Sequence, residues 1–198
     1  EGVARELLAA DVGDEEALHL LAQILNRQAR VGEAVELMAQ LCALTPFCAA
    51  YHNDRGVMLA SLGRWPEAAE AYVAAVTLDP AHVDARFNLA LALFRTKRLP
   101  EARTAFDQLQ SMGHAIPEAD VLHGELLRAE GRPAEAVEAL LRAIARGVET
   151  AEVHVNLGLA FEDMNRGEEA EEALLAANRI AAGQDAAASF HLGNLYRD

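Results

Sequence analysis

The sequence is poor in the residues that mark disulfide scaffolds, disordered segments and membrane spans. Its 198 residues include two cysteines, six prolines and thirteen glycines, and only 5% are aromatic. The spacing of Cys42 and Cys48 fits neither a redox pair nor a zinc site, so we interpret both as small apolar core residues. No apolar run approaches the roughly 18–20 residues of a transmembrane helix, so we expect no direct membrane insertion.

Positive charge is scarce as well. The 17 Lys and Arg residues stand against 31 Asp and Glu residues, which gives a net charge of −14. This balance argues against binding to nucleic acids or to anionic membranes, because both require a concentrated basic surface. Lys97 is the only lysine, which indicates a GC-rich bacterial genome. Because the chain begins at Glu1 without an initiator methionine or a signal peptide, we expect a fragment of a longer, cytoplasmic protein.

Alanine, in contrast, is abundant. It makes up about a fifth of the chain, and hydrophobic residues together make up 52%. Alanine has the highest helix propensity, and its small side chain lets neighbouring helices approach closely. A core of alanine and leucine with few aromatic rings therefore indicates helices packed on helices.

A period of 34 residues runs through the chain without interruption. An arginine recurs with this spacing, a glutamate follows three positions later, and an alanine comes next; the arginines are Arg30, Arg64, Arg98, Arg132 and Arg166. A small residue keeps the same register at Ala22, Gly56, Ala90, Gly124 and Gly158. Such a period predicts a solenoid of stacked repeats. Small residues are expected where two helices cross closely.

The period divides the chain into five repeats, which are 15–48, 49–82, 83–116, 117–150 and 151–184. We predict that residues 1–14 are the second helix of a preceding repeat. Residues 186–198 are predicted to form the first helix of a further or capping repeat.

Each repeat is predicted to contain two helices joined by a short turn. Gly63 and Gly131 lie in two of these turns, where glycine can adopt the left-handed conformation that ends a helix. Pro66, Pro100 and Pro133 predict the start of a second helix, because proline is tolerated in a first helical turn. The recurrent glutamate then lies in that first turn, near the positive end of the helix dipole.

This pattern resembles the tetratricopeptide repeat, and the resemblance covers essentially the whole chain. In the second repeat, the residues at the family's signature positions are Gly56, Leu59, Gly63, Ala68, Tyr72, Ala75 and Pro80. The family's early aromatic residue is replaced by Leu18, His52, Arg86, Asp120 and His154. The resemblance implies an all-α, right-handed α-solenoid of about five and a half helix-turn-helix repeats, stabilised by stacking of neighbouring repeats.

In this family the first helices line a concave groove, so the resemblance implies a protein–protein interaction scaffold or adaptor that binds a protein or peptide segment. The family's groove positions give the partner-binding candidates Asn53, Phe87, Asn88, Leu91, Phe94, Arg95, Val121, Glu125, Arg128, Val155, Asn156, Leu159 and Asn194. Apolar residues with polar neighbours are typical of a binding groove, although some could instead be partly buried between hairpins. Asn88 and Asn156 take a position where family members hold a peptide backbone, but asparagine also serves there as a scaffold residue.

A second candidate surface is the acidic run Glu168, Glu169, Glu171 and Glu172 at the start of a second helix. The run is either a solvated face that complements the helix dipole or a docking patch for a basic partner. We do not expect a chaperone-type partner held by a carboxylate clamp. That clamp needs cations, whereas the corresponding positions include Asn53, Asn88 and Glu118.

No sequence motif indicates catalysis. The chain has no phosphate-binding loop, dinucleotide fingerprint, zinc-protease motif or nucleophile elbow. The seven histidines are scattered over scaffold positions, so we expect no enzyme activity, no metal site and no cofactor. Two alternatives to a simple scaffold stay open. The repeats could be the substrate-recognition arm of a larger enzyme such as a glycosyltransferase, or a bacterial assembly or polarity factor for pili, secretion or motility.

Overall fold

The computed structural model describes residues 2, 14–181 and 190. The partial repeats predicted at 1–14 and 186–198 therefore lie almost wholly outside the described residues. All regular secondary structure between residues 14 and 181 is α-helical, which confirms the all-α prediction. The chain divides into two compact units, residues 1–114 and 115–198.

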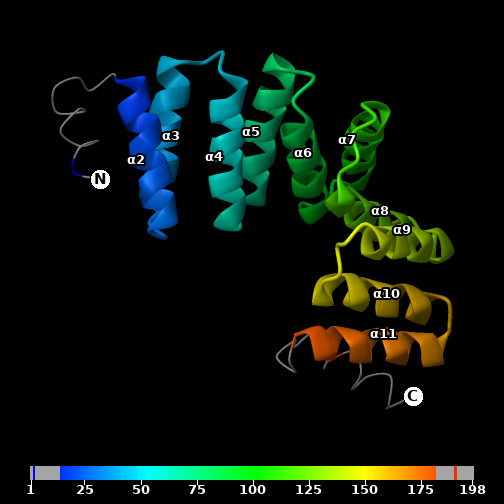
Figure 1. Ribbon diagram of the computed structural model, residues 1–198. Helices are drawn as coiled ribbons and strands as arrows, with labels where there is room; N and C mark the ends of the chain where they lie inside the picture. The colour runs from blue at the N-terminus through cyan, green and yellow to red at the C-terminus, as the bar shows by residue number, and fades with distance from the viewer. Residues whose placement is uncertain (1, 3–13, 182–189, 191–198) are drawn as a thin grey trace. The chain divides into compact units, whose positions relative to one another are not determined.

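The described part of the first unit contains three helical hairpins, whose ribbons are shown in Figure 1. Their helices are α2 (Glu15–Arg27), α3 (Val31–Leu44), α4 (Ala49–Ser61), α5 (Trp65–Leu78), α6 (Val83–Arg95) and α7 (Leu99–Ser111). In each hairpin the even-numbered helix comes first. A second helix packs both against its own first helix and against the first helix of the next hairpin, as α3 does with α4 and α5 does with α6.

The second unit repeats this arrangement in two hairpins. Its helices are α8 (Pro117–Ala129), α9 (Pro133–Ala145), α10 (Ala151–Asp163) and α11 (Gly167–Ile180). Helix α9 packs against both α8 and α10, and α10 also contacts α8 and α11. The first helices of neighbouring hairpins therefore touch each other in this unit, as α4 and α6 do in the first unit.

All five second helices begin with the same ion pair. In α5 the N-cap residue Arg64 donates from Nε to Glu67 Oε1 at 2.7 Å and from Nη2 to Glu67 Oε2 at 2.5 Å. Equivalent pairs join Arg30 to Glu33, Arg98 to Glu101, Arg132 to Glu135 and Arg166 to Glu169. The planar guanidinium matches both carboxylate oxygens at once. This recurring Arg–Glu pair accounts for the two charged residues that the 34-residue period repeats.

The turn inside each hairpin contains one residue in the left-handed conformation. These residues are Ala29 (φ 60°), Gly63 (φ 71°), Lys97 (φ 62°), Gly131 (φ 76°) and Asn165 (φ 57°). The prediction for Gly63 and Gly131 is confirmed. At Ala29 and Lys97 the same backbone carries a Cβ atom, which is unfavourable there for an L-residue.

Close helix contacts explain the small residues of the repeat. A Cβ atom added to Gly56 on α4 would lie 2.5 Å from Tyr72 Cε1 on α5, well inside van der Waals contact. At Gly124 the added Cβ would lie 2.6 Å from Leu140 Cγ. The helices of a hairpin therefore approach so closely that these positions have no room for a side chain, as the register predicts.

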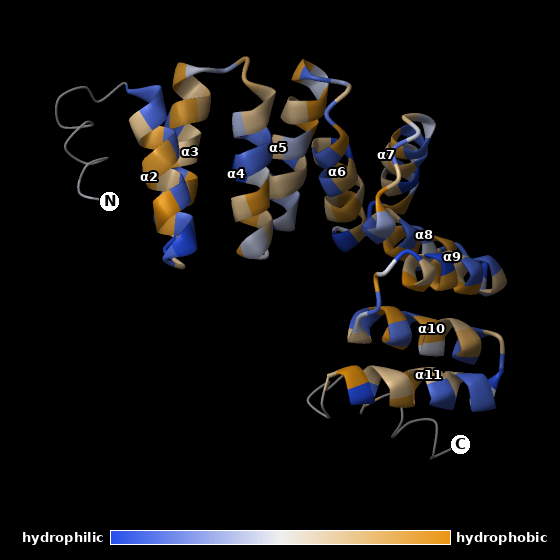
Figure 2. Ribbon diagram, viewed as in Figure 1, coloured by the Kyte–Doolittle hydropathy of each residue, from blue (hydrophilic) through white to orange (hydrophobic). Residues whose placement is uncertain are grey.

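Hydrophobic residues recur along the helices and alternate with hydrophilic ones (Figure 2). Leu59 and Phe106 in the first unit and Leu140 in the second are almost completely buried. Cys42 is buried and Cys48 is partly buried, and neither forms a disulfide. Burial raises the pKa of the Cys42 thiol, so this residue is a poor thiolate nucleophile, as expected of a core residue.

Candidate partner-binding surfaces

The predicted partner-binding residues follow one side of the first helices, which we call the first-helix face. The first unit contributes Asn53 from α4 and Phe87, Asn88, Leu91, Phe94 and Arg95 from α6. The second unit contributes Val121, Glu125 and Arg128 from α8 and Val155, Asn156 and Leu159 from α10. Asn194 lies outside the described residues. Positions three or four residues apart share one side of a helix, so each set forms a stripe.

In the first unit, polar side chains on the first-helix face are bonded from one hairpin to the next. Asn88 Nδ2 donates to Asn53 Oδ1 at 3.2 Å. His19 Nε2 lies 3.0 Å from Asp54 Oδ2, which joins α2 to α4. The Asn88 amide thus already has a partner within the protein, although its second N–H and its oxygen can still serve a bound backbone.

An apolar stripe lies beside these amides on α6. Phe87, Leu91 and Phe94 are all partly buried, so each packs against the protein and still presents surface to solvent. The Lys97 Nζ atom lies 5.8 Å from the centre of the Phe94 ring, within range of a cation–π interaction. The two interpretations of these side chains, scaffold and partner contact, are therefore compatible.

The first unit also has a recess on this face that the sequence analysis did not identify. It has a volume of about 180 Å³ and is lined by Gln23, Asn26, Asp54, Val57 and Met58. Val57 is 43% exposed although it is aliphatic. Gln23 and Asn26 hold the same repeat positions as Leu91 and Phe94, so applying the groove register to the first repeat would have found them.

In the second unit, Asn156 and Val155 are more buried than expected of partner contacts. Asn156 is 9% exposed, and its Nδ2 donates to Glu125 Oε1 at 3.2 Å across the two hairpins. Val155 is 8% exposed and belongs to a small core cluster with Ala177. Val155 therefore contributes to packing and not to an exposed strip, because its side chain points into the hairpin contact.

The remaining first-helix residues of the second unit are more accessible. Val121 and Leu159 are partly buried, and Arg128 Nη1 donates to Asp163 Oδ2 at 3.3 Å. This ion pair again joins the first helices of neighbouring hairpins. Polar links between successive first helices are thus a shared feature of both units.

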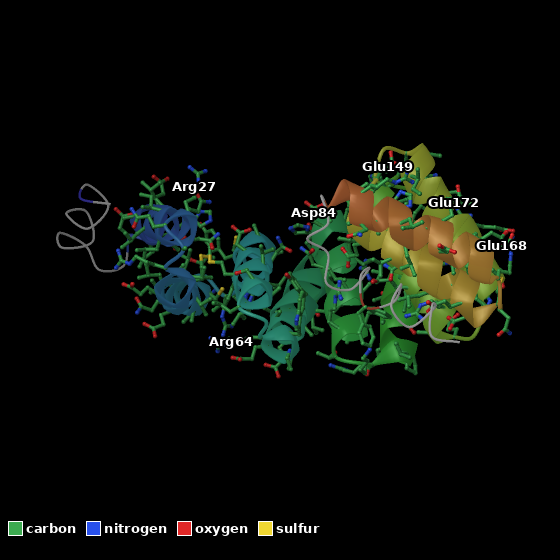
Figure 3. All side chains as sticks on the ribbon, turned by 90° about the horizontal axis from the view of Figure 1, so that it is seen from below. Arg27, Arg64, Asp84, Glu149, Glu168 and Glu172 are labelled. Atoms are coloured by element: carbon green, nitrogen blue, oxygen red, sulfur yellow. The ribbon has the colours of Figure 1, made fainter. Side chains whose placement is uncertain are left out.

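The four carboxylates of the acidic run are not equivalent. All four lie in the first half of α11, where Glu168 and Glu169 occupy the first turn. Glu169 forms the Arg–Glu pair with Arg166, which lowers the pKa of its carboxyl group through hydrogen bonding. Glu168 and Glu172 are exposed and project away from α11 (Figure 3). Part of the run therefore stabilises the helix start, as the first interpretation has it, and part is accessible to a partner.

The described part of the chain offers neither a metal site nor a membrane-spanning helix. Within it, no group of three or more His, Cys, Asp or Glu side chains is arranged to hold a metal ion. None of the helices described between residues 14 and 181 has the length and apolar character to span a membrane.

Sequence comparison identifies both a family and a relative. The family profile described as tetratricopeptide repeat matches residues 19–82, 53–119 and 121–185. A relative, the "TPR repeat-containing thioredoxin TTL4" of Arabidopsis thaliana, is 31% identical over 113 residues. The match covers 57% of this chain but only 16% of that protein.

Solved structures show the same fold. YrrB, described as a TPR protein with an unusual peptide-binding site, has a TM-score of 0.72 at 17% identity, with 96% of this chain and 97% of YrrB covered. PilF of Pseudomonas aeruginosa has a TM-score of 0.77 at 19% identity, with 98% and 86% covered. Because the family profile spans most of the sequence and these neighbours share its helical hairpins, the chain belongs to the tetratricopeptide repeat family.

Proposed function

We propose that this chain is a protein-interaction scaffold that binds an extended segment of a partner protein on its first-helix face. Repeats of this family generally serve as interaction scaffolds, which supports the broad statement. The specific proposal concerns the face and the chemistry of the partner. A segment with apolar side chains and an accessible backbone fits best, because apolar and amide groups alternate on this face.

One observation carries the proposal. Phe87, Leu91 and Phe94 form a partly exposed apolar stripe on α6, directly beside the amides of Asn53 and Asn88. An aromatic ring that is already held on one side loses little conformational freedom when a partner covers the other side. The neighbouring amides can donate to and accept from a bound main chain.

Phe87→Ala tests this proposal. The probe is a peptide selected against the wild-type chain from a displayed random library, and binding is measured by fluorescence anisotropy. We expect Phe87→Ala to weaken binding by about 2 kcal/mol, because truncation removes an aromatic anchor that the peptide desolvates. The melting temperature is measured in parallel to show that the variant is folded.

Phe47→Ala is the matched control. Phe47 is 85% exposed and lies in the turn between α3 and α4, away from the first-helix face. The affinity of Phe47→Ala for the peptide should lie within about twofold of the wild-type affinity, as expected for an exposed residue outside the contact. Normal binding by Phe87→Ala together with lost binding by Phe47→Ala would place the partner elsewhere and contradict the proposal.

A second candidate is that the repeats are the recognition arm of a larger enzyme. The Arabidopsis relative favours it, because a thioredoxin carries matching repeats within 16% of its length. A glycosyltransferase is one enzyme class that carries such repeats. The full-length sequence of the protein tests this second candidate. A catalytic domain on the same chain would support a recognition arm, and a full-length protein made of repeats alone would contradict it.

The assembly-factor alternative shares the scaffold mechanism and differs only in the partner. PilF is 19% identical to this chain, a level that supports the fold alone. We expect neither nucleic acid nor a carboxylate-clamp ligand as partner, because the net charge is −14 and the clamp positions lack cations.

A further inference from the structure

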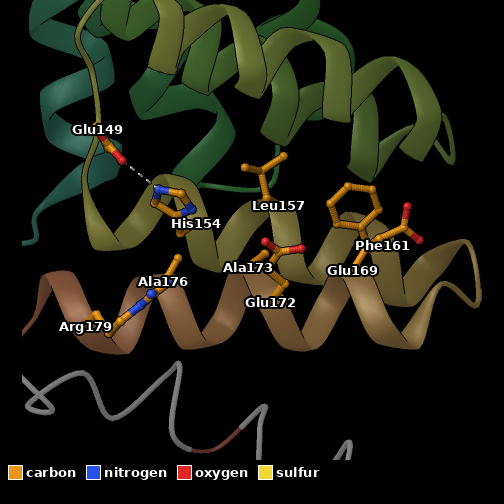
Figure 4. A pocket seen from close by; sticks show the side chains of 9 residues that line it. All are labelled: Glu149, His154, Leu157, Phe161, Glu169, Glu172, Ala173, Ala176 and Arg179. Carbon is orange, nitrogen blue, oxygen red and sulfur yellow. Dashed lines mark ion pairs between the residues drawn. The ribbon is translucent and has the colours of Figure 1, made fainter.

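The second unit contains a recess between α10 and α11 that lies off the first-helix face (Figure 4). We call it the α10–α11 recess. Its volume is about 360 Å³, and it is lined by Glu149, His154, Leu157, Phe161, Glu169, Glu172, Ala173, Ala176 and Arg179. None of these residues belongs to the predicted groove. The floor is apolar, and carboxylates stand at its rim.

Ala176 is one of the short side chains that leave this recess open. Its equivalents one and two repeats earlier are Arg142 on α9 and Gln108 on α7, and both reach across to the first helix of their own hairpin. Gln108 Oε1 accepts from Arg86 Nη1 at 2.5 Å. Arg142 Nε lies 3.5 Å from Asp120 Oδ1. In the α10–α11 hairpin the side chain of Ala176 ends at Cβ, so the corresponding space is open.

The preceding repeat shows which group such a space can hold. Asp120, the equivalent of His154, is 8% exposed and is paired with two arginines. Arg146 Nη1 donates to Asp120 Oδ2 at 2.6 Å, and Arg142 approaches the other oxygen. Within this chain, then, an arginine side chain fills the corresponding space in the preceding hairpin. Its carboxylate partner there is Asp120, whereas in the α10–α11 recess the nearest unpaired carboxylate, Glu172, comes from the second helix.

The carboxylates that line the recess are not all paired with cationic side chains of the protein. Among the described residues, Glu172 has no hydrogen bond or ion pair, whereas Glu169 is held by Arg166. Glu149 Oε1 lies 3.5 Å from His154 Nε2, too far for a strong hydrogen bond, and that nitrogen is buried without another partner. Arg179 stands at the end of the recess beside Ala176 (Figure 4). No hydrogen bond or ion pair joins it to Glu172 among the described residues.

We propose that the α10–α11 recess binds an arginine side chain of a partner protein. The guanidinium meets the Glu172 carboxylate in the two-pronged geometry that arginine favours. The methylene stem lies along Leu157 and Ala173, as the stems of long cationic side chains do on apolar surface. None of the residues that line this site belongs to the first-helix face.

The experiment uses a fluorescein-labelled, end-capped peptide of alanine with one central arginine. Its counterpart carries citrulline, which has almost the same shape without the charge. Chemical-shift titration of this chain should show the arginine peptide perturbing Ala173 and Ala176, and the citrulline peptide binding at least about threefold more weakly. Equal binding of the two peptides overturns the proposal.

Three variants sharpen the test. Glu172→Gln should weaken binding of the arginine peptide by about threefold or more. Glu168→Gln, one turn away and outside the recess, should leave this binding unchanged. Ala176→Gln should abolish binding, because it restores the side chain that fills this space in α7. Equal effects of Glu172→Gln and Glu168→Gln would indicate diffuse charge attraction and overturn a specific site.

Two outcomes separate this inference from its alternatives. Phe87→Ala should leave arginine-peptide binding unchanged, so failure of the first-helix proposal does not affect the recess. Sedimentation of the wild-type chain and Glu172→Gln, without peptide, tests a second copy of this chain as the occupant. If the wild-type chain self-associates and Glu172→Gln abolishes this self-association, the proposal that the occupant belongs to a different protein is overturned.

Discussion

At the scale of single residues, the conformation of the turn inside each hairpin can be predicted from residue type at some positions and not at others. Gly63 and Gly131 predict a left-handed backbone conformation at their positions, and the structure confirms this prediction. Ala29 and Lys97 adopt the same conformation without any local signal, because helix packing on both sides determines the turn. The 34-residue register would have predicted them, since the five left-handed residues in the turns inside the hairpins hold the same repeat position.

Ala29→Gly should therefore stabilise the protein. The left-handed backbone at φ 60° is unfavourable for alanine, and Ala29 is exposed, so its methyl group contributes little packing. We expect the free energy of unfolding to rise by about 0.5–1 kcal/mol, measured by urea denaturation, after allowing for the greater freedom of glycine when unfolded. Gly63→Ala, at φ 71°, should lower it by a similar amount. A loss of stability in Ala29→Gly would contradict this account.

The candidate first-helix face could be predicted from single residues only in part. The positions of Asn88 and Asn156 on the first helices followed from the register, but their partners did not. Asn88 bonds to Asn53 and Asn156 bonds to Glu125, each in the neighbouring hairpin. Such pairs depend on side-chain rotamers and on the exact offset of two helices, which a one-dimensional pattern does not contain.

At the scale of helices, the period predicted most of what is observed. Helices α4 and α10 begin at Ala49 and Ala151, where the second and fifth repeats were expected to begin. Small residues stand where the helices of a hairpin approach each other most closely. The α10–α11 recess was missed, because it lies at a position that varies between repeats, where Ala176 replaces the longer Arg142 and Gln108 of the two preceding repeats.

Gly124→Leu tests the close approach of α8 and α9. A Cβ atom at this position would lie 2.6 Å from Leu140 Cγ and 3.3 Å from the backbone oxygen of Ala136. We expect the free energy of unfolding to fall by about 1–3 kcal/mol through overpacking, measured by urea denaturation. Glu138→Leu, at an exposed position of α9, should change it by less than about 0.5 kcal/mol. Equal effects at both positions would show that the register is wrong.

The Arg–Glu pairs should make stability depend on acid. Hydrogen bonding from Arg98 lowers the pKa of the Glu101 carboxyl group in the folded protein. A lowered folded-state pKa means that the stabilisation is complete above the pKa of the unfolded state and is lost as pH falls through the folded-state value. The melting temperature of Glu101→Gln should therefore lie below that of wild type at about pH 7, and the difference should shrink towards about pH 3.

The control for this prediction is Glu138→Gln. Glu138 is an exposed residue of α9 and has no ion pair among the described residues. Its substitution should change the melting temperature little at either pH. A gap between wild type and Glu101→Gln that persists unchanged in acid would show that the carboxylate charge is not what matters.

At the scale of the whole molecule, repetition made the fold predictable where composition alone did not. Alanine, leucine and few aromatic residues indicate only packed helices. The uninterrupted period specifies hairpins, and hairpins that cannot bury their apolar faces alone must stack on neighbours. Function is less accessible from the same pattern, because the surfaces that differ between repeats determine partners, whereas the period reports what the repeats share.

The Arg–Glu pair and the left-handed turn residue have a consequence for how such a chain can change during evolution. Both partners of each pair, and the turn beside it, lie within one stretch of 34 residues. An in-frame duplication or deletion of one such stretch therefore carries every helix junction with it intact and leaves no arginine or glutamate of this motif without its counterpart. Chain length can grow or shrink by whole modules, while the outward-facing positions are free to diverge towards new partners.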